Sequence, residues 1–178
     1  MFDEKLVTSL QTAFRNSVEA LRRERNEDFY YYGFIFDEGM HPYISAWSYE
    51  AYEKSLIDDE VSEADMAWWK WDYADSPYAV YGYDEYFTEV GRLLDERAES
   101  MSEDELYDVE WYTRMDSMTE ALKRLADEGF FGTEDDRKKV IVNVEQAPPD
   151  CKERERAIML NPASALLEEY LEYCEDEE

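Results

Sequence analysis

Aromatic and acidic side chains alternate through one central stretch of the chain. Residues 58–90 contain ten acids, nine aromatic residues and a single base, Lys70. Aromatic rings supply a large contact area at a small cost in side-chain entropy, and carboxylates accept paired hydrogen bonds from arginine. These residue types at this spacing predict a surface that binds the cationic side chains of a protein partner. The predicted partner-binding residues are Asp58, Asp59, Glu60, Trp69, Asp72, Tyr73, Asp75, Tyr78, Tyr83, Asp84 and Glu85.

The same rings have a second interpretation, because a domain of this length must bury most of its tryptophans. We expect Trp68 and Trp71 to pack in the core rather than to bind a partner. For the tyrosines of the central stretch, the sequence leaves core and interface equally open.

The sequence gives little support for catalysis by histidine or serine, or for a phosphate-binding site. His41 is the one histidine, and it lies between two predicted strands, where a turn position is expected rather than a catalytic one. The chain has no nucleophile elbow, no phosphate-binding glycine loop and no His-Glu-x-x-His motif. We therefore predict a protein that is not an enzyme and that uses no cofactor.

Carboxylate pairs are too frequent to indicate a metal site. The runs 58–60 and 135–136 offer oxygen ligands to a divalent cation, but a solvated charge run is the expected role of each. No segment has the EF-hand pattern, and we predict no metal centre. Cys151 and Cys174 are far apart in the sequence, which favours two reduced thiols over a disulfide bridge.

The charge of the whole chain restricts its partners. Its 178 residues include 46 acids and 18 bases, a formal net charge of −28, and 16% of them are aromatic. Acidic disordered chains are poor in aromatic residues, so the composition predicts a folded anion. The charge is densest over residues 61–120, where 17 acids and 4 bases give −13. Such a field attracts basic proteins and repels nucleic acid and anionic membranes. We therefore expect the protein to bind neither nucleic acid nor a membrane directly.

Length and composition predict the organisation of the chain. With 44% hydrophobic residues, it is expected to form a single α+β domain over residues 1–178, with the last few acidic residues frayed. The sequence has no apolar run of about 20 residues, and its start lacks the pattern of a secretory signal. A cytoplasmic location is therefore expected. Self-association through the anionic stretch is not expected, and the oligomeric state stays open.

Local patterns predict the elements that must position these residues. Apolar residues at every third or fourth position predict a helix from Phe2 to about Arg25. Residues 29–37 and 43–47 read as an antiparallel pair of strands, after which Ser48 caps a helix over 49–57. The stretch 61–86 has no clean period and is expected to form a short helix, a loop and a strand at 78–81.

The second half of the chain is expected to be mainly helical. One helix is predicted over about 84–100, and a second starts at the capping-box pair Ser102 and Glu105 and ends at Gly129. Residues 138–145 form the clearest predicted strand, and Asn161-Pro162 is expected to start the last helix. This order predicts an α+β fold in which a small antiparallel sheet is packed by several amphipathic helices.

A set of sequence segments in a fixed order carries a family resemblance. After the first helix come FYYYGFIFD, WWKWDY, ALKRLADEGFFG, KKVIVNVE and MLNP. In this order the whole chain resembles the bacterial domain-of-unknown-function family numbered 4303. Members of that family look like small cytosolic proteins, some of them encoded among polymorphic-toxin and immunity genes. The resemblance implies an immunity role, and it carries no catalytic residues.

The leading functional hypothesis is a non-enzymatic acidic protein that neutralises a basic partner, most simply an immunity protein against a bacterial nuclease-type toxin. Nucleases need positive surfaces to hold phosphates, so a negative inhibitor gains both rate and specificity. The alternative is a DNA mimic that inhibits a nucleic-acid-binding protein, although clumped acids among aromatic residues favour one specific partner. A carboxylate- or metal-dependent enzyme is the third hypothesis, and acidity suited to a saline cytosol is the fourth.

Overall fold

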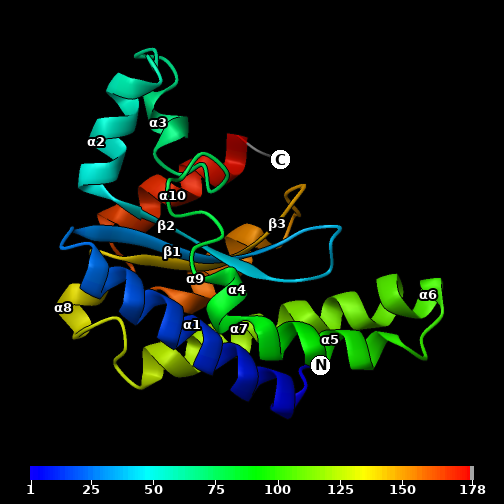
Figure 1. Ribbon diagram of the computed structural model, residues 1–178. Helices are drawn as coiled ribbons and strands as arrows, with labels where there is room; N and C mark the ends of the chain where they lie inside the picture. Colours follow the sequence, from blue (N-terminus) through cyan, green and yellow to red (C-terminus); the bar gives the residue numbers. More distant parts are fainter. Residues whose placement is uncertain (177–178) are drawn as a thin grey trace.

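The centre of the molecule is a three-stranded mixed sheet in the order β2-β1-β3 (Figure 1). The computed structural model describes residues 1–176. Strand β1 (Phe29–Phe36) pairs antiparallel with β2 (Tyr43–Ser48) and parallel with β3 (Ile141–Gln146). The α+β fold and the predicted antiparallel pair are therefore confirmed.

The direction of β3 corrects the expectation of an antiparallel sheet. Ser48 at the end of β2 lies opposite Phe29 at the start of β1, and Ile141 at the start of β3 lies opposite Tyr31. The chain thus leaves the sheet and returns to it at the same end. A strand that starts where β1 starts must run parallel to β1, and the long helical segment between β2 and β3 makes this crossover possible.

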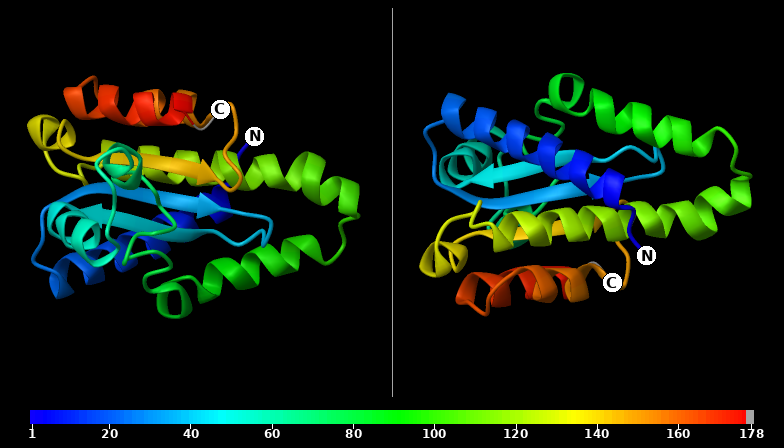
Figure 2. Two further views of the ribbon diagram at one scale, coloured as in Figure 1. Left: turned by 90° about the horizontal axis from the view of Figure 1, so that it is seen from above. Right: turned by 90° about the horizontal axis from the view of Figure 1, so that it is seen from below.

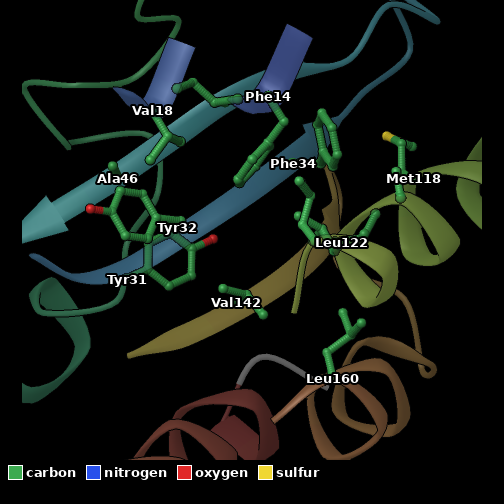
Figure 3. Packing of buried hydrophobic residues seen from close by; sticks show 14 of the residues in the cluster. Phe14, Val18, Tyr31, Tyr32, Phe34, Ala46, Met118, Leu122, Val142 and Leu160 are labelled. Carbon is green, nitrogen blue, oxygen red and sulfur yellow. The ribbon is translucent and has the colours of Figure 1, made fainter. Parts of the chain in front are cut away.

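One face of the sheet is covered by α1 (Glu4–Glu24) and α7 (Trp111–Asp127), and α5 (Thr88–Ala98) lies beside α1, to the side of the strands (Figures 1 and 2). Helix α1 forms as predicted, with an N-cap bond of 2.9 Å from the Leu6 N–H to the Asp3 carboxylate. Its apolar stripe is buried because it meets the aromatic strand β1: the rings of Phe14 and Phe34 lie 4.7 Å apart (Figure 3). Leu122 of α7 closes this part of the core.

The other helices complete two further sides of the molecule. Helices α2 (Tyr49–Asp58) and α3 (Met66–Trp69) lie over the opposite face of the sheet, and α9 (Glu153–Leu160) and α10 (Ala165–Asp176) lie beside β3 (Figures 1 and 2). The shorter helices are α4 (Tyr83–Tyr86), α6 (Glu103–Glu105), the π-helical turn η1 (Leu106–Glu110) and α8 (Glu134–Arg137).

Two local expectations are wrong. Residues 78–81 form turns instead of a strand, because Val80 and Gly82 have left-handed backbones with φ of 61° and 68°. Asn161 does not cap the last helix: its side chain bonds the backbone of Val142 on β3, accepting at 2.9 Å and donating at 2.8 Å. Ser164 caps α10 in its place, since its hydroxyl oxygen accepts from the Leu167 N–H at 3.1 Å.

Other expectations are confirmed within the described residues. Ser48 caps α2, Ser102 and Glu105 form a capping box, and Cys151 and Cys174 are free thiols.

The expected fraying concerns residues 175–178: residues 175 and 176 belong to α10, whereas 177 and 178 lie outside the described residues. Over residues 1–176, no helix is long and apolar enough to cross a membrane.

Candidate functional site

Five carboxylates converge on a groove of about 410 Å³ at the end of the sheet where β1 begins. Helix α2 supplies one wall, and its residues Glu50, Lys54 and Asp58 lie on one face because they are spaced four apart. The segment before β1 and the loop at 75–78 supply the other wall. We call this hollow the acidic groove; its charged and aromatic lining residues are Arg25, Glu27, Glu50, Lys54, Asp58, Asp59, Asp75 and Tyr78.

Glu27 is held in place by two hydroxyl groups. Its carboxylate accepts hydrogen bonds from Ser48 at 2.5 Å and from Tyr78 at 2.6 Å. Burial and the nearby Glu27 raise the pKa of Tyr78 above its ordinary value, so this phenol stays protonated and donates. Because Ser48 also accepts from the Ala51 N–H at 3.0 Å, the same serine fixes the start of α2 and one carboxylate of the groove.

The far end of α2 adds negative charge that the ion pairs of the fold neutralise only in part. Asp58 and Asp59 lie at the C-terminal end of this helix, where the helix dipole is already negative and acids are unfavourable. Lys54 pairs with Asp58. Among the ion pairs of residues 1–176, none includes Asp59 or Asp75. The groove therefore keeps carboxylates available for a cation from outside.

The groove also shows how a cation can be seated. The guanidinium carbon of Arg25 lies 5.9 Å from the centre of the Tyr78 ring, within the range of a cation–π contact. Trp69 lies close by, because its indole N–H donates to Ser55, a lining residue, at 2.9 Å. Glu60 follows Asp59 in the chain, has a left-handed backbone with a φ of 52°, and is exposed to solvent.

The predicted site residues fall into three groups. Asp58, Asp59, Asp75 and Tyr78 line the acidic groove, and Glu60 and Trp69 lie next to it. Asp72 and Tyr73 belong to a loop that is clamped onto β2, and Tyr83, Asp84 and Glu85 belong to α4.

The clamped loop has a structural role. Asp72 is only 7% exposed, and its carboxylate accepts from the Ala74 N–H at 2.8 Å. Its carbonyl accepts from the Trp47 indole at 2.7 Å, and the Tyr73 carbonyl accepts from Ser45 at 2.8 Å. These backbone contacts hold the loop against β2 and leave Asp72 little surface for a partner.

Helix α4 packs against α1 and α5, on the face of the sheet opposite α2 (Figure 1). The Tyr83 hydroxyl lies 3.2 Å from His41 Nδ1, and His41 Nε2 lies 3.0 Å from Asp95. His41 thus occupies the turn between β1 and β2, as expected, and links it to α5. The central acidic stretch is divided between two sides of the molecule.

The two tryptophans expected in the core have different environments. Trp71 is 1% exposed and packs between Tyr30 and Tyr170, which confirms the expectation for this residue. Trp68 is 40% exposed, so the expectation is wrong there: α3 is a single short turn at the surface, and it cannot direct both of its tryptophans inward.

Sequence reasoning missed four of the seven charged residues that line the acidic groove. Arg25, Glu27, Glu50 and Lys54 lie outside the central stretch, in segments where the only local signal was the position of Glu50 in the first turn of a helix. They meet Asp75 only because the loop after α3 folds back over the start of β1. Over residues 1–176, no group of three or more His, Cys, Asp or Glu residues is arranged to hold a metal ion.

A three-stranded mixed sheet between helical layers, with an acidic groove at one end, defines an α+β protein with an anionic surface site. Residues 10–162 match the family model described as Domain of unknown function (DUF4303), and the chain belongs to this family. The chain matches no curated protein and no solved structure.

Proposed function

We propose that this protein is a non-enzymatic acidic binding protein that neutralises a basic protein partner through the acidic groove. The observation that carries the proposal is the imbalance of charge there: five carboxylates face two cations, and Asp59 and Asp75 make no ion pair within the described residues. A hollow of about 410 Å³ has room for side chains of a partner.

The groove and the net charge act at different ranges. A net charge of −28 raises the association rate of a basic partner at long range, and salt screens this effect. At contact, the carboxylates of the groove suit a guanidinium, which forms paired hydrogen bonds with carboxylates. Tyr78 is only 7% exposed, so its ring supports the groove from below rather than offering a free face. The association rate and the specificity of the contact therefore both favour a partner with an arginine-rich surface.

The partner that fits this chemistry most simply is a bacterial nuclease-type toxin, which would make the chain an immunity protein acting in the cytoplasm. A nuclease must present positive charge to bind phosphates, and an inhibitor of complementary charge covers that surface. A DNA mimic is the alternative. It would place acids at regular intervals along an extended face, whereas the acids of this groove converge on one hollow.

The test is titration of the protein encoded by the adjacent gene with two double variants. Asp59→Asn with Asp75→Asn removes two groove charges. Glu19→Gln with Asp127→Asn removes two charges from exposed positions on α1 and α7, on the other side of the molecule. We expect one-to-one binding that salt weakens, a loss of about tenfold or more in the first variant, and about twofold or less in the control.

Equal losses in both variants would mean that the overall field acts without a specific groove. Absence of binding at low and at high salt would contradict the immunity proposal, and nucleic-acid-binding proteins would then be the targets to titrate.

A further inference from the structure

A second hollow surface lies along α7, at the opposite end of the strands from the acidic groove. It consists of two adjoining hollows of about 160 and 290 Å³ that share Trp111, Tyr112 and Gln146. We call it the aromatic groove, and its principal lining residues are Tyr107, Trp111, Tyr112, Met115, Gln146 and Pro148.

The helix itself aligns these side chains. Tyr107, Trp111 and Met115 are spaced four apart and form one stripe along the continuous helical segment that includes η1 and α7. The rings of Tyr107 and Trp111 stack with centroids 6.3 Å apart and planes at 28°. The π-helical turn η1, a feature frequent at functional sites, supplies Tyr107 to the groove.

Trp111 is rigidly positioned. Its indole N–H donates to the side-chain oxygen of Gln146 at 3.0 Å, and its ring packs 4.5 Å from that of Phe36 at the end of β1. A fixed aromatic ring loses little entropy when a partner binds, so Trp111 is suited to be an anchor.

The neighbouring rings are open to solvent. Tyr107 is 49% and Tyr112 is 53% exposed, and Val109 between them is 61% exposed. An exposed apolar patch of this kind, rimmed by polar residues, is typical of an interaction site.

The charges around the groove select cations. The Lys152 ammonium lies 5.3 Å from the centre of the Tyr112 ring, and Asp116 pairs with the N-terminal ammonium of the chain. Glu155 and Glu38, on the walls of the two hollows, take part in no ion pair within residues 1–176. Lys152 of the chain itself thus contacts the Tyr112 ring, and the carboxylates of Glu155 and Glu38 stay available for cations of a partner.

The length of the groove indicates the form of its occupant. The stretch of helix from Tyr107 to Thr119 measures ~18 Å at 1.5 Å per residue. An extended chain covers this distance with about five residues. A short extended segment therefore fits the groove.

We propose that the aromatic groove binds an extended, arginine-bearing segment of a protein partner, with a guanidinium on the Trp111 and Tyr112 rings and its charge facing Glu155 or Glu38. This site goes beyond the acidic groove and does not depend on it. The two grooves flank opposite ends of β1, whose eight residues span roughly 26 Å, so a segment of five residues cannot occupy both.

The experiment follows the indole N–H signals of ¹⁵N-labelled protein during titration with a seven-residue glycine-serine peptide that contains two arginines. A matched peptide carries neutral citrulline in place of arginine. Trp111 reports on the aromatic groove, and Trp69, bonded to Ser55, reports on the acidic groove. We expect a saturating shift of the Trp111 signal with the arginine peptide and affinity at least tenfold weaker with the citrulline peptide.

Variants test each part of the site. Tyr112→Ala should weaken the peptide at least tenfold, and Tyr112→Phe, which keeps the ring, should bind as the parent does. Glu155→Gln should weaken binding severalfold, whereas Glu168→Gln, an exposed acid on α10, should not. Lys152→Ala should strengthen binding severalfold, because the peptide then no longer competes with the protein's own lysine for the Tyr112 ring.

Three results would overturn the inference: no shift of the Trp111 signal, equal shifts with both peptides, or a shift of the Trp69 signal alone. The double variant Asp59→Asn with Asp75→Asn should leave the Trp111 titration unchanged. The inference therefore stands or fails separately from the proposed inhibition of a toxin.

Discussion

At the residue scale, the most unusual groups are two acids buried between β3, α9 and α10. Glu145 is 1% and Glu153 is 5% exposed. The Tyr170 hydroxyl lies 2.7 Å from the first carboxylate and 3.1 Å from the second. The Tyr31 hydroxyl also donates to Glu145, and Tyr170 accepts from Asn143 at 2.9 Å. Because Tyr170 has a single proton, it can donate to only one of the two carboxyl groups, and a proton on one of these groups completes the network.

The position of these acids predicts an unusual dependence of stability on pH. Burial, and then repulsion from Glu153, raise the pKa of Glu145 well above its ordinary value, and burial raises the pKa of Glu153 to about 7. The folded state then holds protons that the unfolded state has released. This stabilising contribution is complete below the ordinary pKa of 4.5 and is lost as pH rises through the folded-state values.

We therefore expect the free energy of unfolding to fall by roughly 1–3 kcal/mol between about pH 5 and about pH 8. In Glu145→Gln this fall should be markedly smaller, as measured by urea unfolding across the pH range. Glu155→Gln, an exposed acid on the same side of the molecule, is the matched control and should keep the parent profile. A parent protein whose stability rises over this range would contradict the assignment.

At the element scale, α5 and α7 form a hairpin that extends beyond the end of the sheet (Figures 1 and 2). A buried ion network holds it together. Glu110 accepts from Arg97 at 2.7 Å and from Arg114 at 3.0 Å, and Arg97 also reaches Asp3 at the start of α1 at 2.7 Å. Burial alone would raise the pKa of Glu110, but the two guanidinium groups hold it below its ordinary value.

Glu110→Ala should destabilise the protein by about 3–5 kcal/mol, because it leaves the Arg114 guanidinium buried without its carboxylate. Arg114 is 2% exposed, so water cannot replace the lost partner. Chemical unfolding measures the loss. Glu89→Ala, which removes an exposed pair with Arg92 on α5, should have little effect. Similar losses in the two variants would mean that burial of the network contributes nothing.

The end of α2 predicts a conflict between stability and binding. Asp59→Lys places a cation at the negative end of the helix dipole and should stabilise the protein by about 0.3–1 kcal/mol. The same change should weaken a basic partner, because it reverses one charge of the acidic groove. Asp127→Lys is the matched control at the end of α7: it should give a similar gain in stability with no loss of binding. Thermal unfolding and titration measure the two effects, and a groove variant that binds at parent strength would exclude Asp59 from the contact.

At the scale of the whole molecule, the net charge of −28 opposes the compact state through self-repulsion. Raising salt from roughly 0.01 M to roughly 1 M shortens the Debye length from about 30 Å to about 3 Å. We expect the melting temperature to rise by several degrees over this range while association with a basic partner slows. Calorimetry and stopped-flow mixing measure the two effects. Sucrose at matched osmolarity is the control: it does not screen charge, so it should not slow association electrostatically. A melting temperature that falls with salt would contradict the prediction.

The sequence by itself determined what depends on neighbouring residues. The apolar spacing from Leu6 to Leu21 sets helix α1, Ser48 and Ser102 set helix starts, and the aromatic run of β1 sets a buried strand with its hairpin partner. In each case the deciding hydrogen bonds and the periodicity of apolar residues span only a few positions, so they can be read from a short segment. The anionic character of the protein follows from composition alone.

The tertiary structure alone decided what depends on residues far apart in the chain. The parallel direction of β3, the binding of Asn161 to β3, and the separation of α4 from the rest of the acidic stretch all follow from how the segments pack. Glu27 meets Asp75 across the acidic groove, although 48 positions (75 − 27) separate them. No local pattern predicts this contact. An acid in a solvated run and an acid in a groove can have the same neighbours in sequence, and they differ only in the residues that the fold places opposite them.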